Sequence, residues 1–410
     1  MMGRLGAFVA AMIVGFAVLI ALTSGDEVDE VAELAVAAPT ATPIPEPTPT
    51  PAPTPTPTPE PPRSVTLAFT GDLLSHGGVI EQARQNGTES LVYDYRPMFA
   101  LVAPILQEVD LAICHQETPL SADNTNLSGF PIFNAPGDLA TAVAEAGWDG
   151  CSVASNHALD KGLTGVTETL DMLDRAGLAH SGTARSEVEA TTPTIYDVGG
   201  VGIGQLSFTY GTNGIPIPAD APWSVNVTTV DAVLAQAAAA RAAGADFVVL
   251  NIQWGNEYQQ APSADQTELA STFLASPDID MIVGAHVHVI QPAEVIDGEL
   301  VLYGLGNFLS NQSPQSCSSC PAGTQDGMIF EVTVDEVSPG VFAATAAHIT
   351  PTFVDRSTYE VIPVAQALAD PATPDSLIAA LEASYERTVQ AVRALDVSTE
   401  LVTIEPLAAE

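Results

Sequence analysis

The sequence predicts a large α/β domain that begins near Ser64 and has strands buried on both faces. Short β-rich runs alternate with stretches of helical length, which is the pattern of α/β folds. Apolar residues make up 46% of the chain, enough to fill a sizeable core. The β-rich runs are Val65–Phe69, Leu111–Cys114, Gly150–Ala154, Phe247–Ile252 and Met281–Val283. The helix candidates are Met98–Val109, Asp138–Ala146, Gly165–Ala176, Val230–Ala243 and Ser263–Leu274.

Later segments predict antiparallel strands and a terminal helix. Gly199-Gly200 separates two β-like runs, Thr194–Val198 and Val201–Phe208, and this pattern predicts a hairpin. No internal repeat is visible in the sequence. Three further segments are expected to be regular, namely the strands Gly327–Val334 and Val341–Val354 and the helix Asp375–Leu395.

The N-terminal residues 1–24 predict a membrane segment. Arg4 precedes an unbroken apolar run of 18 residues, from Leu5 to Leu22. As a helix this run would measure roughly 27 Å, enough to cross a bilayer. A cleaved signal peptide has a similar design, but no small-x-small cleavage site follows, so we favour an uncleaved anchor. The expected location is the cell membrane with an extracytoplasmic domain, or the exterior if the segment is cleaved.

Residues 25–63 predict a linker rich in proline and threonine. Twelve of the 24 residues from Pro39 to Pro62 are proline. Such a stretch prefers polyproline II and would reach about 75 Å at ~3.1 Å per residue. It is either a spacer that lifts the domain off a membrane or a disordered linker. The remaining chain divides into a main domain, residues 64–355, and a C-terminal helical extension, residues 356–410.

The charge of the chain is strongly negative. Its 50 acidic and 11 basic residues give a formal net charge of −39, and Lys161 is the single lysine. Such a surface repels a phosphate backbone, so we expect no nucleic-acid partner. Acidity of this kind favours solubility and says nothing about the fold.

Polar clusters follow nearly every β-like run. Because ligand sites of α/β sheets lie at the carboxyl ends of strands, these clusters are expected to converge in one crevice. Their carboxylate, amide and imidazole groups together suit Zn, Mn or Fe better than an all-oxygen calcium site. The clusters are Gly71-Asp72, His115 with Glu117, Ser155-Asn156-His157 with Asp160, Gln253–Tyr258, His286-Val287-His288 with Gln291-Pro292, and Gly304–Phe308.

The order of these motifs resembles the poly-gamma-glutamate capsule biosynthesis family, usually called CapA. The motifs are Gly-Asp, Glu-Thr-Pro, Ser-Asn-His-x-x-Asp-x-Gly, Trp-Gly-x-Glu-Tyr, His-x-His-Val-x-Gln-Pro and Tyr-x-Leu-Gly-Asn-Phe. The match covers roughly Ser64 to Val354. The family looks like a divergent branch of the calcineurin-like metallophosphoesterases. The resemblance therefore implies a four-layer αββα sandwich.

The resemblance also implies a site for one or two divalent ions, Zn, Mn or Fe. Asp72 and His288 would bind one ion. Asn156 and His286 would bind the other, with Glu117 in the bridging place. A hydroxide between two ions ~3.5–4 Å apart would attack phosphorus or a carbonyl.

Other motif residues would support this chemistry. His157 would be the general acid or phosphate-binding imidazole, oriented by Asp160. Gln291 or Asn307 would hold the histidine tautomers. The residues expected to line the pocket or to support the ligands are His76, His115, Gln253, Trp254, Glu257, Gln291 and Asn307.

Two departures from the superfamily pattern weaken the expected ligand set. The first motif of the superfamily is Asp-x-His, whereas Leu74 stands at the histidine position here, and His76 is a candidate replacement. A further histidine of the family is Gln253 in this chain. The second metal would then bind loosely or not at all, so the site would hold one metal or none.

Each motif also has a purely structural explanation. Gly71-Asp72 is common as a turn or helix N-cap, and Asn156-His157 fits a capped helix start. Glu117 would then be a surface carboxylate. His286 and His288 favour a ligand pair, since alternate residues of an extended segment face the same way. Residues that fit packing or the pocket wall equally well are Trp254, Tyr258 and His115.

The four cysteines fit an oxidising compartment. Cys317-Ser-Ser-Cys320 lies in a polar loop without a thioredoxin-like context, which favours a local disulfide over redox catalysis. Cys114 and Cys151 end neighbouring predicted strands. They are either buried thiols or a second bridge.

Three functions are compatible with the sequence. The first is a role in making, anchoring or exporting poly-gamma-glutamate, in contact with a polymer synthetase complex. The second is a secreted metal-dependent phosphoesterase acting on small phosphate esters. The third is a non-catalytic surface-binding protein on the same fold. The membrane segment, the linker and the motif set favour the first, although a polyanion is an awkward partner for this charge.

Overall fold

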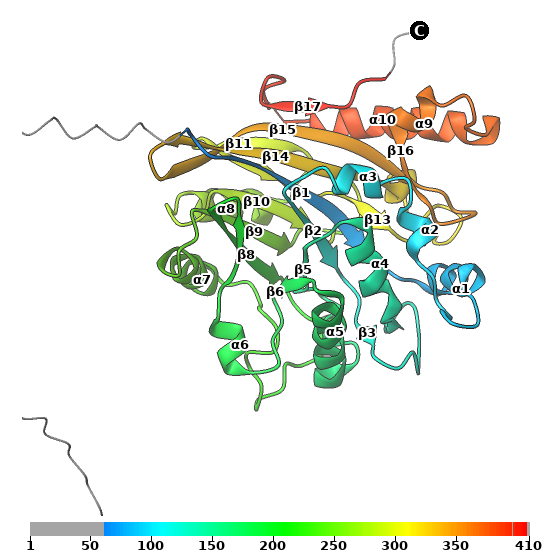
Figure 1. Cartoon of the computed structure of the whole chain (residues 1–410), viewed down its shortest axis with the longest axis horizontal. Helices are drawn as coiled ribbons and strands as arrows, with labels where there is room; N and C mark the ends of the chain where they lie inside the picture. Colours follow the sequence, from blue (N-terminus) through cyan, green and yellow to red (C-terminus); the bar gives the residue numbers. More distant parts are fainter. Residues whose placement is uncertain (1–60, 396, 408–410) are drawn as a thin grey trace, which may run out of the picture. The chain divides into compact units, whose positions relative to one another are not determined.

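Two β-sheets form the framework of the protein in a computed structural model that describes residues 61–395 and 397–407 (Figure 1). The first sheet has nine strands, in the order β16-β15-β14-β1-β2-β5-β6, with β13 beside β1 and β17 beside β15. Its strands are β1 Ser64–Leu73, β2 Leu111–Gln116, β5 Gly150–Ser152, β6 Ala179–Ser181, β13 Asn307–Leu309, β14 Asp326–Ser338, β15 Val341–Val354, β16 Val361–Pro363 and β17 Val402–Ile404.

The second sheet has six strands, in the order β11-β12-β10-β9-β8-β7. Its middle strands β8, β9, β10 and β12 run parallel, while β7 and β11 pair antiparallel at the two edges. A separate two-stranded ribbon joins β3 Leu120–Ser121 and β4 Ala135–Pro136. The six strands are β7 Thr194–Val198, β8 Val201–Thr209, β9 Phe247–Gln253, β10 Met281–Ala285, β11 Ala293–Ile296 and β12 Glu299–Leu302.

The two sheets pack face to face, because alternate residues of each strand point to opposite sides. On β1, Leu67 and Phe69 belong to a core shared with Phe247 and Val283 of the second sheet. Ala68, between them, belongs to a different core with the helices α1 to α5. Both sheets are therefore covered on both sides, as the apolar runs predict.

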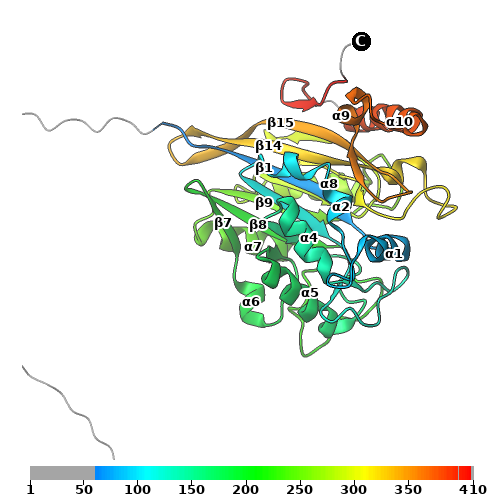
Figure 2. The same cartoon turned by 45° about the vertical axis from the view of Figure 1, so that its right-hand side comes forward.

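Helices form the outer layers. On the first sheet α4 and α5 lie over β2 and β5, and α7 and α8 cover the second sheet (Figures 1 and 2). The α/β sandwich predicted from the sequence is confirmed. The helices are α1 Gly77–Asn86, α2 Arg96–Phe99, α3 Ala103–Leu106, α4 Asp138–Ala146, α5 Gly162–Ala176, α6 Glu187–Thr191, α7 Val230–Ala242, α8 Ala264–Leu274, α9 Val364–Ala369, α10 Asp375–Val392 and the 3-10 turn η1 Ala322–Gln325.

The residues after Val354 are part of the same compact unit as the rest of the described chain. They supply the strands β16 and β17, which both pair with β15, and α9 and α10 lie along that strand (Figure 1). Arg387 of α10 forms a two-pronged ion pair with the buried carboxylate of Asp326, at 2.6 and 2.8 Å. The C-terminal segment thus extends the main sheet as well as adding a helix.

Some predicted elements differ from those observed. The helix predicted over Met98–Val109 is two short helices, α2 and α3, because Pro104 starts a new helix at Ala103. The hairpin at Gly199-Gly200 is present as β7 and β8. The membrane segment lies outside the described residues, as does nearly all of the linker. No helix within the described ranges is long and apolar enough to cross a membrane.

Candidate metal centre

The carboxyl ends of several parallel strands meet at one place between the sheets. Asp72 lies at the end of β1, and Glu117 follows β2. His286 and His288 follow β10 of the second sheet. β1 can deliver Asp72 here because Gly71 passes against the backbone of Gly306, where a Cβ atom would lie 2.1 Å from the carbonyl oxygen. The backbone N–H of Asp72 donates to that same carbonyl at 3.0 Å.

Asp72, Glu117 and His288 form a compact buried group. One possible ligand atom from each lies within 4.8 Å of the others. His288 Nδ1 donates to Asp72 Oδ2 at 2.9 Å, and its Nε2 lies 3.9 Å from Glu117 Oε1. Two carboxylates and an imidazole at this spacing suit a divalent transition-metal ion.

His288 is held from a second side by Asn307. Asn307 Oδ1 lies 3.1 Å from His288 Nδ1. The amide of Asn307 cannot turn round, because its Nδ2 donates to the carbonyl of Thr324 at 2.9 Å and to Gln312 Oε1 at 3.1 Å. Nδ1 of His288 therefore carries its proton toward two oxygens, and Nε2 faces Glu117.

Several buried polar atoms of the site have no hydrogen-bond partner. They are both carboxylate oxygens of Glu117, Asn156 Oδ1 and His286 Nδ1. Unpartnered buried atoms are rare because each costs about 1–3 kcal/mol. These four are acceptor or imidazole atoms of the kinds that bind a metal, so the residues present fit a divalent ion.

Burial and neighbouring charges raise the pKa values of Glu117 and His288 and lower that of His286. Burial raises the pKa of Glu117 to about 7. Burial, and then the charge of His288, lower the pKa of His286 to about 3. Burial also acts to lower the pKa of His288, but the carboxylates of Glu117 and Asp72 outweigh it and raise that pKa to about 9.

The two histidines reach the site through a strained turn. His286 has φ 90° and His288 has φ 59°, values that non-glycine residues rarely adopt. The expectation that they share a face of an extended segment is wrong. They follow the end of β10, and their ring centroids lie 6.0 Å apart. Such strain is maintained where a site requires it.

His157 and Asp160 form a second pair beside this group. His157 Nδ1 lies 2.8 Å from Asp160 Oδ2, which also accepts the backbone N–H of Phe133 at 2.7 Å. The imidazole packs edge-on against the Phe133 ring, with centroids 4.7 Å apart. The carboxylate fixes the ring, and Nε2 is left with a contact of 3.5 Å to Asn213 Nδ2.

The side-chain oxygen and nitrogen of Gln253 both have hydrogen-bond partners. Its Oε1 accepts from the backbone N–H of Asn156 at 2.6 Å and from the Thr209 hydroxyl at 3.0 Å. Its Nε2 lies 3.1 Å from Nε2 of His115. Where the family pattern has a histidine ligand, this glutamine joins three strand ends. His115, bonded to Ser152 on its other side, is part of the same link.

The other predicted support residues lie in different surroundings. His76 is partly buried, which lowers its pKa to about 4, and its Nδ1 accepts from the backbone N–H of Asn311 at 3.3 Å. Trp254 packs on Tyr303 and donates to its carbonyl oxygen, so it belongs to the core. Gln291 bonds Gln266 and backbone carbonyls, not a histidine.

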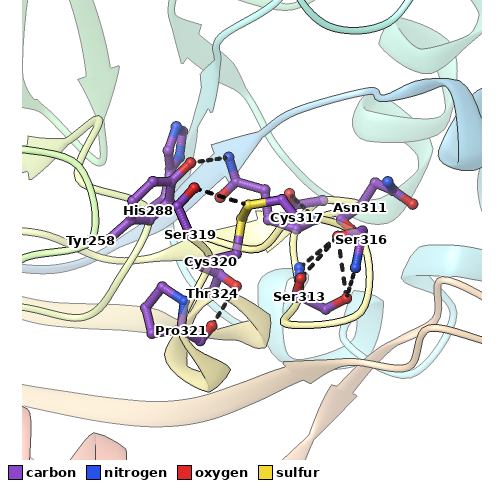
Figure 3. Close-up of a disulfide and its surroundings, with 12 residues drawn as sticks. Tyr258, His288, Asn311, Ser313, Ser316, Cys317, Ser319, Cys320, Pro321 and Thr324 are labelled. Carbon is purple, nitrogen blue, oxygen red and sulfur yellow. Dashed lines mark hydrogen bonds between the residues drawn. A yellow bond between two sulfur atoms is a disulfide. The ribbon is translucent and has the colours of Figure 1, made fainter.

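A cavity of about 380 Å³ opens onto His288. Glu257 and Tyr258 form part of one wall, and the loop closed by the Cys317–Cys320 disulfide forms another (Figure 3). Gln312 joins the two walls by donating to the Tyr258 hydroxyl at 3.4 Å. Residues that line it are Leu74, His76, Phe130, Phe133, His157, Glu257, Tyr258, His288, Asn311, Gln312, Ser316, Cys317, Ser319 and Cys320.

Both cysteine pairs are disulfides in the structure. Cys317 and Cys320 close the predicted local bridge. Cys114 and Cys151 join the neighbouring strands β2 and β5, which settles the alternative of buried thiols.

Sequence reasoning missed several residues of the site. Phe133, Asn213 and Tyr210 lie outside every motif, yet they contact His157 or His286. Gln312 was missed as well, although it follows the last motif by only a few residues. The one signal in the sequence is a polar residue shortly after a predicted strand, such as Asn213 after β8.

Comparisons with known proteins agree with the motif order. The family model described as "Bacterial capsule synthesis protein PGA_cap" matches residues 66–312. The capsule biosynthesis protein CapA of Bacillus anthracis is 30% identical over 256 residues, which are 60% of this chain and 60% of that protein. The PGA biosynthesis protein CapA of Bacillus subtilis (strain 168) is 28% identical over 255 residues, 60% of this chain and 64% of that protein.

The matched region is thus less than two thirds of the length of either relative. Among solved structures, the calcineurin-like phosphoesterase YfkN from Bacillus subtilis aligns with a TM-score of 0.43 at 15% identity, covering 81% of this chain and 100% of that chain. The resemblance drawn from the motifs is confirmed by the family model. Since that model spans more than half of the chain, the chain belongs to the PGA_cap family of bacterial capsule synthesis proteins.

Proposed function

We propose that this chain acts in the synthesis, anchoring or export of a γ-linked glutamate polymer through a metal-dependent hydrolytic site. The observation that carries the proposal is the buried group Asp72–Glu117–His288, with its unpartnered neighbours, in a member of a capsule synthesis family. The relatives named above are capsule or PGA biosynthesis proteins. An extracytoplasmic place is supported by the apolar run Leu5–Leu22 and by the two disulfides.

The residues of the chain have separable roles in this proposal. A divalent ion, when bound, would polarise the attacked carbonyl or phosphoryl group and lower the pKa of a water molecule. Asp72, Glu117, Asn156, His286 and His288 would hold the ion. Asp72 Oδ2 also accepts from the Nδ1–H of His288 at 2.9 Å and so keeps that proton in place.

His157 would deliver a proton to the leaving group. Asp160 and Phe133 hold the ring so that Nε2 is available. An imidazole held in this way is the usual arrangement for general acid catalysis. The walls of the cavity limit the access of bulk water to the bond that breaks.

A small phosphate ester is the second candidate substrate. The His157–Asp160 pair favours it, since a fixed imidazole also binds phosphate oxygens. Leu74 and Gln253 support a third candidate, a binding protein without catalysis. Leu74 cannot bind a metal, and both ends of the Gln253 amide already have hydrogen-bond partners.

Metal content of the full-length protein tests the proposal. We expect stoichiometric Zn, Mn or Fe in the wild type and none in the double variant His286→Ala/His288→Ala. The matched control is His180→Ala/His348→Ala, two histidines outside the site that bond Asp174 and Thr403. Absence of metal from the wild type after incubation with excess ion would sink the hydrolytic role.

Substrate assays then separate the first two candidates. Release of glutamate oligomers from a γ-linked polymer, lost in His157→Gln, supports the capsule role. Cleavage of small phosphate esters alone supports the second candidate. If the protein binds metal and cleaves neither, a scaffold in the polymer synthetase complex is the remaining function.

A further inference from the structure

Two exposed aromatic side chains stand beside the candidate metal centre. Among the large apolar side chains that are exposed within the described residues, the aromatic ones are Phe130, which is 75% exposed, and Tyr210, which is 48% exposed. Phe130 lines the cavity described above, and the Tyr210 ring lies 4.5 Å from that of His286. Exposed rings that gather at a site, instead of scattering over the surface, indicate a binding surface.

These two rings end a continuous row of contacts. Phe130 packs on Phe133 at 6.4 Å, and Phe133 packs on His157. Asn213 continues the row, since its Nδ2 lies 3.5 Å from His157 and its Oδ1 accepts from the Tyr210 hydroxyl at 3.4 Å. The row therefore passes the imidazole of His157, and the ring at either end, Phe130 or Tyr210, is exposed.

The polar lining of the cavity is not suited to anions. No lysine or arginine is among the described residues that line it. The guanidinium of Arg356 lies nearby, but it donates to Ser310 and Asn311 and lies over the Tyr359 ring. The chain also carries a net charge of −39. A carboxylate or phosphate away from the metal would find no lysine or arginine here, and the imidazole of His288 is already paired with Asp72 and Glu117.

The remaining polar groups match hydroxyl groups instead. The carboxylate of Glu257 lines the cavity and interacts with the Tyr258 hydroxyl, and its second oxygen is a further acceptor. The hydroxyl of Ser319 has only a weak contact with Cys317 Sγ at 3.5 Å. A sugar ring offers both required surfaces. Its C–H face is apolar and flat enough to pack on an aromatic ring, and its hydroxyls bond carboxylates, amides and other hydroxyls.

We propose that Phe130 and Tyr210, at the two ends of this row, bind a neutral oligosaccharide next to the metal centre. The uncharged ligand would lie along the aromatic row, and the metal would remain for the bond that reacts. It rests on the proposed function only in taking the metal centre as the reacting site. It also removes the difficulty of an acidic chain that binds a polyanion along its whole length.

The test is calorimetric binding to the full-length protein in EDTA, so that metal does not contribute. The probes are a neutral chito-oligosaccharide and a γ-linked glutamate oligomer of the same length. We expect the saccharide to bind and the glutamate oligomer not to bind. Phe130→Ala and Tyr210→Ala should each weaken saccharide binding about tenfold.

Conservative variants and a distant control make the result specific. Tyr210→Phe and Phe130→Tyr keep a ring and should bind like the wild type. Val188→Ala removes another side chain that is 75% exposed, far from the motifs, and should change nothing. No saccharide binding, or equal binding by the two alanine variants, would overturn the proposal. Glutamate-oligomer binding that is lost in those variants would overturn it too.

The outcome is independent of the proposed function. If the protein lacks metal and hydrolytic activity but still loses saccharide binding in Phe130→Ala, only the hydrolytic proposal fails. If the two alanine variants keep metal and activity with unchanged saccharide binding, only the saccharide proposal fails.

Discussion

The two histidines of the candidate centre have opposite surroundings. On the His288 side, Asp72 and Asn307 both bond the imidazole, and every polar atom of Asn307 has a partner. On the His286 side, His286 Nδ1 and Asn156 Oδ1 have none. Glu117, whose Oε1 lies 3.9 Å from His288 Nε2, has no hydrogen bond at either carboxylate oxygen. The hydrogen bonds on the His288 side therefore hold that ring in place without a metal ion. The unpartnered atoms on the His286 side indicate that this side requires a bound ligand.

The largest expected effect comes from Glu117, the carboxylate with two unpartnered oxygens. Glu117→Gln keeps the shape of the side chain but removes its charge, so the affinity for Zn or Mn should fall at least about 100-fold, or about 2.7 kcal/mol. Glu257→Gln, in the wall of the cavity that opens onto His288, is the matched control and should bind metal normally. Calorimetric titration measures both. Equal affinity of the Glu117 variant and the wild type would remove Glu117 from the ligand set.

Asparagine variants should separate the two sides. Asn307→Ala leaves the Thr324 carbonyl without a partner and removes one of the two oxygens that His288 Nδ1 faces, so the free energy of unfolding of the metal-free protein should fall by about 1–3 kcal/mol. Asn156→Ala loses one long hydrogen bond, of 3.3 Å to Asn213, and should cost less than about 1 kcal/mol. Urea unfolding compares them.

Metal affinity should weaken in Asn156→Ala despite its small effect on stability, since Asn156 Oδ1 is one of the unpartnered atoms. The comparison fails if Asn156→Ala destabilises the metal-free protein more than Asn307→Ala does.

The two sides should also respond to pH with opposite signs. The pKa of His288 is raised to about 9, so its stabilisation is present below pH 6.5 and is lost as pH rises to 9. The pKa of His286 is lowered to about 3, so between pH 6.5 and 3 the folded protein keeps this ring neutral while the unfolded chain takes up a proton. Stability is therefore lost as pH falls from 6.5 toward 3. Each slope reaches at most about 1.4 kcal/mol per pH unit.

Unfolding of the metal-free protein at pH 5, 7 and 9 measures both slopes. His288→Gln should flatten the alkaline limb alone, and His286→Gln the acidic limb alone. If each variant changes both limbs equally, the two rings do not have separate environments.

The smallest effect is expected from the disulfide loop behind the His288 side. Gln312 and Thr324, which hold Asn307, flank the Cys317–Cys320 bridge. Cys317→Ser/Cys320→Ser should loosen this support and lower metal affinity about threefold, below the range usual for direct supporting residues. Thermal stability should fall less than in Cys114→Ser/Cys151→Ser, because the sequence separations of the bridges are 3 and 37. Unchanged affinity would mean that the loop does not support Asn307.

Local patterns were enough to predict much of the fold and the convergence of Asp72, Glu117 and His288. The helix Asp138–Ala146 and the strand Val341–Val354 have the predicted bounds, since their periodicity and flanking glycines are local signals. Asp72, Glu117 and His288 come together because parallel strands deliver their carboxyl ends to one edge.

Features that depend on distant partners were not predictable. The strands β16 and β17 have only three residues each and exist through their pairing with β15. The role of Gln253 depends on Asn156 and His115, which belong to other strands. The left-handed backbone of His286 and His288 is imposed by the site, and nothing in a His-Val-His run signals it.

The position of β1 has a consequence for how the chain is made. β1 is the first strand within the described residues, yet it lies between β2 and β14, and its residues Ser64 to Thr70 pair with Asp335 to Ile329. The centre of the first sheet therefore cannot close until the ribosome has released most of the chain. Such a high contact order predicts slow folding, with β1 exposed to wrong partners in the meantime. A chain that must cross a membrane before folding would benefit from this delay.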